Sequence, residues 1–370
     1  MKAIKKSLMV ALSLTISGQA MAAKNSNDTY IEGLNSYVQE LKKYGGDDVA
    51  STFKTYAEEV NKEQLKVGYI GPKLSIPEAV KVTDNVYTVV GSLIWHNPSN
   101  YGLNNNLTFI EFEDGVFVFN AGPNPAIAAA FHRVIKEHTS KPVKWLAVEN
   151  NQGHAHLGAS YWHSQGVRNI YSHDVAFKAI EEDFEYTKNT WGRIVGHEIT
   201  DSSRDISEHY TTFDDKLSID VGGGETVELL NFGPGHTPGS TVAYVPSKNV
   251  VLPGDLAYNS RMIAIFSYTD SFAWNESFMK FYNSMPKDVI VIPGHGGATD
   301  LEKVKEDTYG YLAFLHEAVK QHIADGKGEA ELGEIDQSAY KDRPVYQQTH
   351  ELNATRIYKA LMRDSFVGNE

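Results

Sequence analysis

The pattern of apolar and polar positions changes once in the N-terminal part of the chain. Between Asp28 and about Lys66, apolar side chains recur at helical spacing, which predicts two amphipathic helices. From Ala79 onward, short runs rich in β-branched and aromatic residues alternate with turn residues. The pattern predicts a helical addition over residues 23–70, followed by a β-containing domain over residues 71–300.

The predicted domain opens with strands and continues as alternating helices and strands. The expected strands are residues 80–82, 86–90, 107–112, 116–120, 143–148, 169–171, 226–232, 241–245, 250–252 and 289–292. The expected helices are residues 126–138, 160–165, 175–185 and 301–324, the last within a C-terminal helical segment over residues 301–370. Two opening hairpins followed by strands with intervening helices favour an α/β fold of mixed sheets covered by helices.

The first 22 residues have the order of a secretory signal peptide. A basic start, Met1 to Lys6, precedes an apolar run from Leu8 to Ile16 and the small-residue site Ala20-Met21-Ala22. This run is too short to span a bilayer, and no later segment approaches the ~20 apolar residues that a membrane helix needs. We therefore expect cleavage after Ala22 and a mature protein that is periplasmic or secreted, without a membrane span.

Composition and charge limit the kinds of partner that we expect this protein to bind. The chain has 370 residues, 41% apolar and 22% charged, as is typical of a folded globular protein. Its net charge is −13 and its Lys and Arg residues form no basic stripe, so we do not expect nucleic acid as a partner. We expect a small-molecule substrate instead. It has no cysteine, so any metal must be held by nitrogen and oxygen.

Four segments place histidine or aspartate in a glycine-containing turn after an apolar strand. They are Gly153-His154-Ala155-His156, Gly235-His236-Thr237-Pro238, Pro253-Gly254-Asp255 and Pro293-Gly294-His295. Strand ends at one edge of a sheet are where α/β folds gather functional residues. In an extended segment, His154 and His156 would point the same way and reach one ion. Imidazoles with a carboxylate suit a hydrolytic zinc site that keeps one position open; the alternative is that these are ordinary polar loop residues.

Three of these segments resemble motifs of the metallo-β-lactamase superfamily. They are Gly235–Ser240, Leu252–Asp255 and Pro293–Gly296, within a resemblance that covers roughly residues 80–297. The resemblance implies an αββα sandwich of two mixed sheets with helices outside. It also implies that His236 binds a first metal ion, that His295 binds a second, and that Asp255 bridges the two.

The first histidine motif departs from the pattern of this family, which is H-x-H-x-D-H followed one residue later by glycine. If His154 and His156 are the opening pair, the expected Asp and His fall on Gly158 and Ala159. If Gly158 is instead the glycine of the motif, only His156 is kept, and the other two histidines and the aspartate are replaced by Asn151, Gly153 and Ala155. Both registers stay open, and both lack the motif aspartate.

These features predict an exported, metal-dependent hydrolase acting on an ester, lactone, lactam, or sulfate or phosphate ester. The candidate ligands of one or two zinc ions are His154, His156, His236, Asp255 and His295. Zinc in such a site lowers the pKa of the water that it binds to about 7. With the motif aspartate absent, Asp255 is also the candidate that assists proton transfer.

Two other functions stay open on the same residues. Two histidines with Asp255 also form the ligand set of a mononuclear iron oxygenase, so iron is a possible metal. A non-catalytic binding protein that retains the fold is the third reading, because Asn120 stands where the family usually has aspartate. The sequence leaves open whether residues 93–97 and 261–266 line a pocket or pack as ordinary loops.

Overall fold

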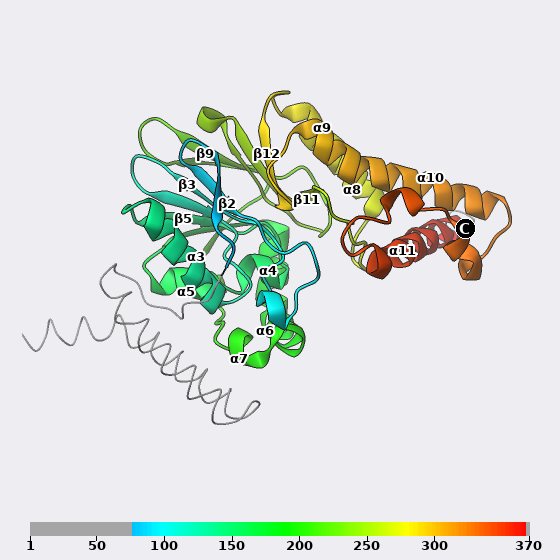
Figure 1. Cartoon of the computed structure of the whole chain (residues 1–370), viewed down its shortest axis with the longest axis horizontal. Coiled ribbons are helices and arrows are strands. Elements are labelled where there is room, and N and C mark those ends of the chain that lie inside the picture. Colours follow the sequence, from blue (N-terminus) through cyan, green and yellow to red (C-terminus); the bar gives the residue numbers. More distant parts are fainter. Residues whose placement is uncertain (1–75, 368–370) are drawn as a thin grey trace, which may run out of the picture. The chain divides into compact units, whose positions relative to one another are not determined.

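The computed structural model describes residues 76–367, which belong to one compact unit, Ser75–Glu370 (Figure 1). The predicted signal peptide at residues 1–22 and the predicted helical addition at residues 23–70 lie outside the described residues. Within residues 76–367, every helix is too short or too polar to cross a bilayer.

The first sheet has seven strands in the order β1-β2-β3-β4-β5-β6-β7. Their bounds are β1 Ala79–Thr83, β2 Val86–Val89, β3 Leu107–Glu111, β4 Val116–Phe119, β5 Val143–Ala147, β6 Asn169–His173 and β7 Tyr210–Phe213. The strands from β1 to β4 are antiparallel, and those from β4 to β7 pair in parallel. The parallel half places the ends of β4 and β5 at one edge of the sheet, where the loops of the candidate site begin.

The second sheet has five strands in the order β12-β11-β10-β9-β8. Their bounds are β8 Lys216–Asp220, β9 Thr226–Leu230, β10 Val242–Val245, β11 Val250–Tyr258 and β12 Ile290–His295. The strands from β8 to β11 are antiparallel, whereas β11 and β12 are parallel. Both sheets are therefore mixed, as the sequence predicts.

Helices cover the outer faces of the two sheets. They are α3 Pro125–His138, α4 Gly153–His156, α5 Ala159–Ser164, α6 Asp174–Val195, α7 His197–Thr200, α8 Ser271–Ser284, α9 Leu301–Val304, α10 Tyr311–Ala324 and α11 Tyr346–Val367. One core joins Phe117 and Trp145 of the first sheet to Leu229 and Leu252 of the second. A second core packs α8, α10 and α11 against the second sheet, and α3 lies on the first (Figure 1). The predicted αββα sandwich is confirmed.

The structure differs from the predicted elements at several bounds. The strands β7 and β8 and the helix α8 have no counterpart among the predicted elements, and the helix predicted at residues 175–185 extends to Val195. β8 is an edge strand with a single buried residue, so it carries too few apolar positions to stand out. β11 continues through Pro253 and Gly254 to Tyr258, so Asp255 lies inside a strand rather than in a turn after it.

The C-terminal segment holds the loop that follows β11. Ile265 N donates to Asn353 Oδ1 at 2.8 Å, and Asn353 Nδ2 donates to the carbonyl of Ile263 at 3.0 Å. Met262 N donates to the carbonyl of Pro344 at 3.2 Å. The predicted C-terminal helical segment thus packs into the same unit as the sandwich and supports one wall of the pocket described below.

Candidate metal centre and pocket

The centre of the candidate site is Asp255, a buried residue of strand β11 in the second sheet. The parallel pairing of β11 and β12 brings His295 beside it, with His295 Nε2 at 3.2 Å from Asp255 Oδ1. The contact requires glycine at position 294, because a Cβ there would lie 2.4 Å from Asp255 Oδ1. Gly294, within β12, therefore allows the side chains of Asp255 and His295 to approach each other.

The two histidines of the first motif diverge, contrary to the expectation for an extended segment. Residues Gly153–His156 form the short helix α4, in which side chains two residues apart are about 200° apart around the axis. His154 Nε2 lies 3.4 Å from Asp255 Oδ2. His156 instead places its ring 6.0 Å from the Phe184 ring of α6 and does not line the pocket. The expectation that both histidines reach one ion from an extended chain is wrong.

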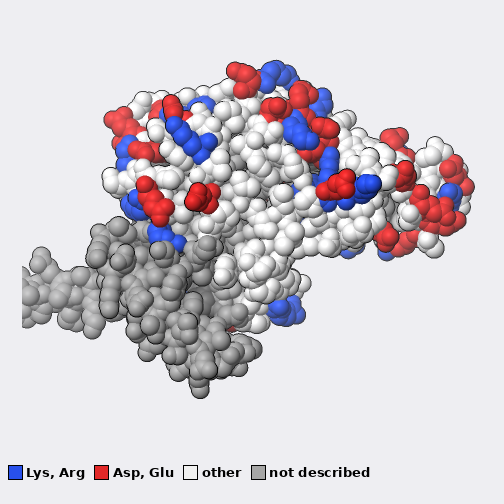
Figure 2. All heavy atoms as spheres, viewed as in Figure 1, with Lys and Arg blue, Asp and Glu red and all other residues white. Residues whose placement is uncertain are grey.

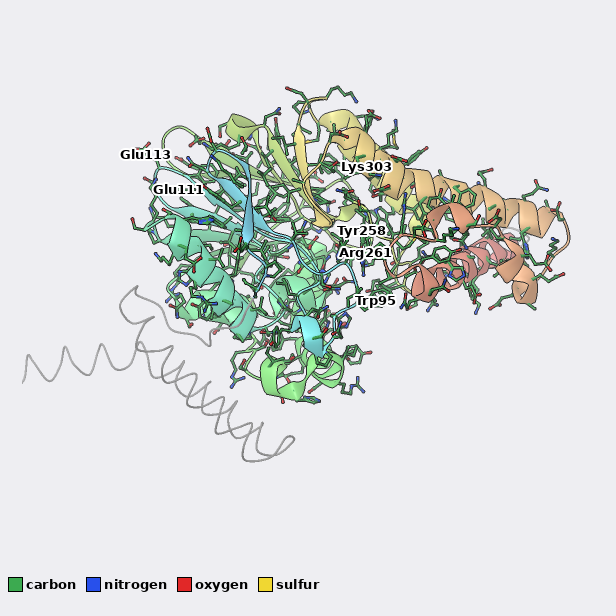
Figure 3. The ribbon with its side chains drawn as sticks, in the orientation of Figure 1. Trp95, Glu111, Glu113, Tyr258, Arg261 and Lys303 are labelled. Atoms are coloured by element: carbon green, nitrogen blue, oxygen red, sulfur yellow. The ribbon has the colours of Figure 1, made fainter. Side chains whose placement is uncertain are left out.

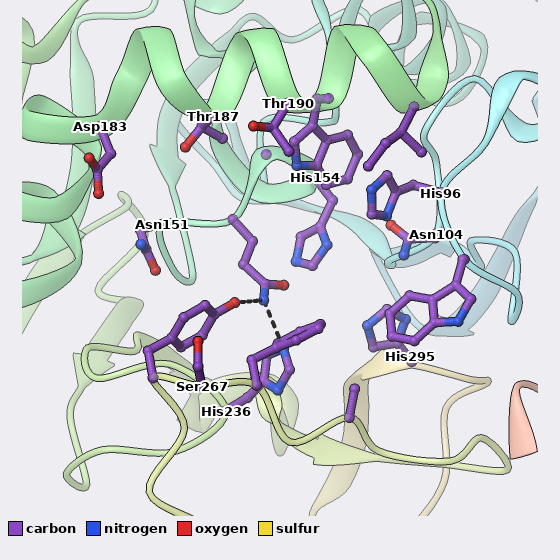
Figure 4. Close-up of a pocket in the computed structure, with 18 of the residues that line it drawn as sticks. His96, Asn104, Asn151, His154, Asp183, Thr187, Thr190, His236, Ser267 and His295 are labelled. Atoms are coloured by element: carbon purple, nitrogen blue, oxygen red, sulfur yellow. Dashed lines mark hydrogen bonds between the residues drawn. The ribbon is translucent and has the colours of Figure 1, made fainter. Parts of the chain in front are cut away.

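His236 borders this group without joining it. It follows β9 in the loop of residues 233–240, and its Nε2 lies 3.9 Å from Asp255 Oδ2. The amide Nε2 of Gln152 lies 2.8 Å from the same ring nitrogen and 2.9 Å from Tyr268 OH, as the dashed lines in Figure 4 mark. Because an amide nitrogen only donates, the lone pair of His236 Nε2 accepts from Gln152.

Among the residues that the structure describes, His154, Asp255 and His295 form a group whose ligand atoms lie within 4.8 Å of one another. Asp255 Oδ1 and His154 Nε2 are buried and have no hydrogen-bond partner. Two ligand atoms on one tetrahedral zinc ion lie about 3.3 Å apart, since each bond is about 2.0 Å. The observed separations of 3.2 and 3.4 Å match that spacing, so these residues fit a divalent metal ion.

The charge states also suit a metal. Burial lowers the pKa of His236 and that of His295 to about 4, so both rings are neutral at physiological pH and can act as ligands. Burial opposes ionisation of Asp255, but the adjacent His295 and His154 outweigh it and hold the pKa well below its usual range. The site thus combines neutral imidazoles with an ionised carboxylate.

Glu149 is a buried residue of the site that the sequence did not single out. Its Oε2 accepts a hydrogen bond from Asp255 N, and its Oε1 accepts one from Asn120 Nδ2 at 2.8 Å. Burial, reinforced by the charge of Asp255, raises its pKa well above the usual value. The sequence offered one signal that could have identified Glu149, because it is an acidic residue directly after a buried strand.

The backbone around Gly158 favours the second register of the first motif. Gly158 N donates to the carbonyl of Gly122 at 2.8 Å, and a Cβ on Gly158 would lie 2.3 Å from the carbonyl oxygen of Ala121. Gly158 therefore anchors this loop against the turn after β4. In this register His154 occupies a position that carries no ligand in the family pattern, yet it is His154 that faces Asp255.

The group opens into a cavity of about 430 Å³ (Figure 4). His154, His236 and His295 lie on its wall. Its other walls include Trp95, His96, Trp191, Arg261, Phe266 and Tyr268. The loops of residues 93–97 and 261–266, for which the sequence left pocket lining open, thus contribute to the pocket.

Comparisons with known proteins agree with this fold. No family model matches the chain. It is 27% identical over 204 residues to the Probable metallo-hydrolase YqgX of Bacillus subtilis (strain 168), which covers 53% of this chain and 87% of that protein. The solved structure of a metallo-beta-lactamase from Pontibacter korlensis superposes with a TM-score of 0.51 at 19% identity, over 64% of this chain and 98% of that one. DIM-1 metallo-beta-lactamase exposed to ceftazidime superposes with a TM-score of 0.51 at 15% identity, over 65% and 99%.

The two mixed sheets, the strand-end loops around Asp255 and these likenesses define a protein of the metallo-β-lactamase fold. The chain thus shares this fold, and its first histidine motif, Gly153–His156, departs from the H-x-H-x-D-H pattern.

Proposed function

We propose that this protein is a metal-dependent hydrolase whose reaction takes place where His154, Asp255 and His295 meet the pocket. The observation that supports the proposal is that buried ligand atoms without hydrogen-bond partners stand at metal-ligand spacing beside a cavity. The names of the relative and of the structural neighbours also favour hydrolysis. A zinc ion held there would lower the pKa of water to about 7 and polarise the scissile bond.

We assign different roles to the residues of the site. His154, His295 and Asp255 would hold one zinc ion, and the neutral His236 stays hydrogen-bonded to Gln152 beside it. Asp255 is ionised while the pKa of Glu149 is raised, so Asp255 is the candidate that accepts the proton of the attacking water. The substrate belongs to the esters, lactones, lactams, or sulfate or phosphate esters.

Metal analysis combined with a substrate panel tests this proposal. We expect the purified full chain to retain about one zinc ion and to hydrolyse at least one of an aryl ester, a lactone, a β-lactam, an aryl sulfate or an aryl phosphate. Asp255→Asn should lose both properties. Asp288→Asn removes a carboxylate from an exposed residue and should leave both unchanged. Zinc retention by Asp255→Asn at the wild-type level would contradict the proposed ligand set.

An iron oxygenase is the second candidate function. The tight group contains two histidines and one carboxylate, which is the facial ligand set of mononuclear iron oxygenases. Iron in the purified protein, together with oxygen consumption and no hydrolysis, would favour this reading. Absence of bound metal, with no effect of His236→Ala on any activity, would favour a non-catalytic binding protein.

We also propose that the protein is exported. The basic start, the apolar run and the small-residue site of residues 1–22 support export to the periplasm or the medium. Fractionation of a bacterial host tests it: the full chain should appear outside the cytoplasm with a new N-terminus at Ala23. Deletion of residues 2–22 should retain it inside.

A further inference from the structure

Gln152 is bonded to the nitrogen of His236 that lies nearer to Asp255. The amide Nε2 of Gln152 lies 2.8 Å from His236 Nε2, and that ring nitrogen lies 3.9 Å from Asp255 Oδ2 (Figure 4). The same amide lies 2.9 Å from Tyr268 OH, so both of its hydrogens have an acceptor. A ring nitrogen has a single lone pair, so His236 Nε2 cannot accept this hydrogen bond and bind a metal ion at the same time.

The other ligands that the family pattern gives to an ion at His236 are missing. In the register that Gly158 favours, Asn151 and Gly153 stand at the positions of two motif histidines. A Cβ on Gly153 would lie 2.4 Å from Trp191 Nε1, so the indole fills the space that a side chain at position 153 would need. An ion at His236 would therefore fall short of the three protein ligands that a catalytic zinc ion usually has.

The carboxylate of Asp255 lies closer to other side chains than to His236. Its Oδ1 is 3.2 Å from His295 Nε2, and its Oδ2 is 3.4 Å from both His154 Nε2 and Asn150 Nδ2. The distance from Oδ2 to His236 Nε2 is 3.9 Å. Two ligand atoms on one tetrahedral zinc ion lie about 3.3 Å apart, so the spacing suits an ion shared with His154 and His295 better than one shared with His236.

The remaining surroundings of His236 are aromatic and positively charged. The rings of Phe266, Trp274 and Tyr258 lie 5.3, 5.5 and 6.0 Å from the His236 ring. The guanidinium of Arg261 lies 5.8 Å from the Tyr258 ring (Figure 3). Burial lowers the pKa of His236 to about 4, and the charge of Arg261 adds to this lowering. A divalent ion at His236 would meet the same positive charge, which opposes its binding.

We propose that the side chain of Gln152 occupies the position that the first metal ion takes in the family pattern, so that the site holds at most one ion. A neutral hydrogen-bond donor then stands where the two-ion arrangement implied by the resemblance has a cation. This inference rests on the proposed function only for the ligands of the single ion. The role of Gln152 itself is measured by the difference in ion number between variants.

Replacement of Gln152 by glutamate tests this role. Gln152→Glu keeps the shape of the side chain and puts a carboxylate oxygen beside His236, which with Asp255 completes three protein ligands. Gln152→Met fills a similar volume without a charged ligand. Gln165→Glu is the matched control, because Gln165 lies outside the pocket and donates to Ser164 Oγ. Each full-length protein is stripped with EDTA and dialysed against zinc, and elemental analysis gives the number of ions per chain.

We expect one ion in the wild type, in Gln152→Met and in Gln165→Glu, and two ions in Gln152→Glu. Carboxylates are spread over the surface in Figure 2, and they can bind zinc weakly. Cobalt substitution separates such ions from the site, because two cobalt ions bridged by Asp255 give a spin-coupled electron paramagnetic resonance signal. We expect this coupling only in Gln152→Glu. Melting curves show that the variants are folded.

Three results would overturn the inference. They are two coupled ions in the wild type, no additional ion in Gln152→Glu, and an equal gain in Gln152→Met and Gln152→Glu. The last result would mean that His236 and Asp255 hold an ion without a further ligand. A wild type that binds one ion but hydrolyses nothing would contradict the hydrolase proposal and leave this one standing. A wild type without metal, with one ion in Gln152→Glu, would contradict the proposed zinc ligands and still support the role of Gln152.

Discussion

Asn120 and Glu149 form a matched pair at the end of two adjacent strands. Asn120 has a φ of 72°, donates through Nδ2 to Glu149 Oε1, and accepts through Oδ1 from Glu149 N at 3.1 Å. An aspartate at position 120, as the family pattern has, would face a second buried carboxyl group at this point. Asparagine at position 120, in place of the aspartate of the family pattern, therefore suits the buried Glu149.

The variant Asn120→Asp tests this pairing. It replaces a donor by a carboxylate against Glu149 in a buried site, so we expect the free energy of unfolding to fall by roughly 2–4 kcal/mol at pH 7.5. Asn85→Asp is the control, because Asn85 also has a positive φ, 61°, but is exposed. Urea unfolding of both variants measures the difference, and equal stabilities would rule out the pairing.

A single methyl group beside Asp255 tests the candidate metal centre. In Gly294→Ala the new Cβ would stand 2.4 Å from Asp255 Oδ1, so the carboxylate must move. We expect zinc affinity to fall at least tenfold, measured by competition with a chelating dye. Gly297→Ala is the matched control, since nothing lies within 4 Å of a Cβ there. A loss of affinity in both variants would point to a general effect on the loop instead.

At the scale of elements, the C-terminal helices position one wall of the pocket. The side chain of Asn353 in α11 bonds both Ile265 N and the carbonyl of Ile263, two backbone groups of the loop that follows Arg261. Asp307, in the helical turn before α10, accepts from Ser260 N at 2.7 Å and pairs with Arg343 at 2.7 Å. A loop held at both ends in this way keeps Arg261 in place.

The variant Asn353→Leu removes the bonds to this loop without removing volume. Two buried backbone groups lose their partners, so we expect a loss of about 2–4 kcal/mol in the free energy of unfolding, measured with urea. Asn169→Leu removes an exposed side-chain bond to the carbonyl of Lys144 and should change this free energy little. Equal unfolding free energies for Asn353→Leu and Asn169→Leu would show that the bonds from α11 do not stabilise the loop.

At the scale of the whole molecule, burial of histidines makes stability depend on pH. Burial lowers the pKa of His316 to about 4, from an ordinary 6.5, and that of His132 to about 3. Between pH 6.5 and 4 the unfolded chain binds more protons than the folded one, so stability rises with pH in this window and is complete above it. The metal-free protein should therefore lose stability as the pH falls from 6.5 to 4.

His316→Gln isolates one of these groups, because His316 lies on α10, where it bonds Ser271 and stacks on Phe272. A difference of about 2.5 pKa units corresponds to a change on the order of 3 kcal/mol. The loss of unfolding free energy between pH 6.5 and pH 4 should be smaller by about that amount in the variant, so its slope against pH is shallower. Parallel slopes for the variant and the wild type would contradict the predicted contribution.

The sequence by itself determined the class of fold and the strand-end positions of His236 and His295, whereas it placed Asp255 in a turn and the structure has it inside β11. Both follow from local patterns: apolar runs mark the strands, and glycine and proline mark the turns after them. The sequence did not predict β8 or the full length of α6, because few of their residues are buried and the apolar pattern is correspondingly weak.

Only the tertiary structure decided which side chains face Asp255. The helix α4 is four residues long, too short to leave a periodic signal, and it turns His154 toward Asp255 and His156 toward Phe184. Glu149 pairs with Asn120, and Arg261 in the pocket wall donates to the carbonyl of Leu93, so both have partners far away in the sequence. Local patterns report on the neighbours of a residue along the chain, whereas burial and charge pairing depend on contacts that form only when the two sheets pack together.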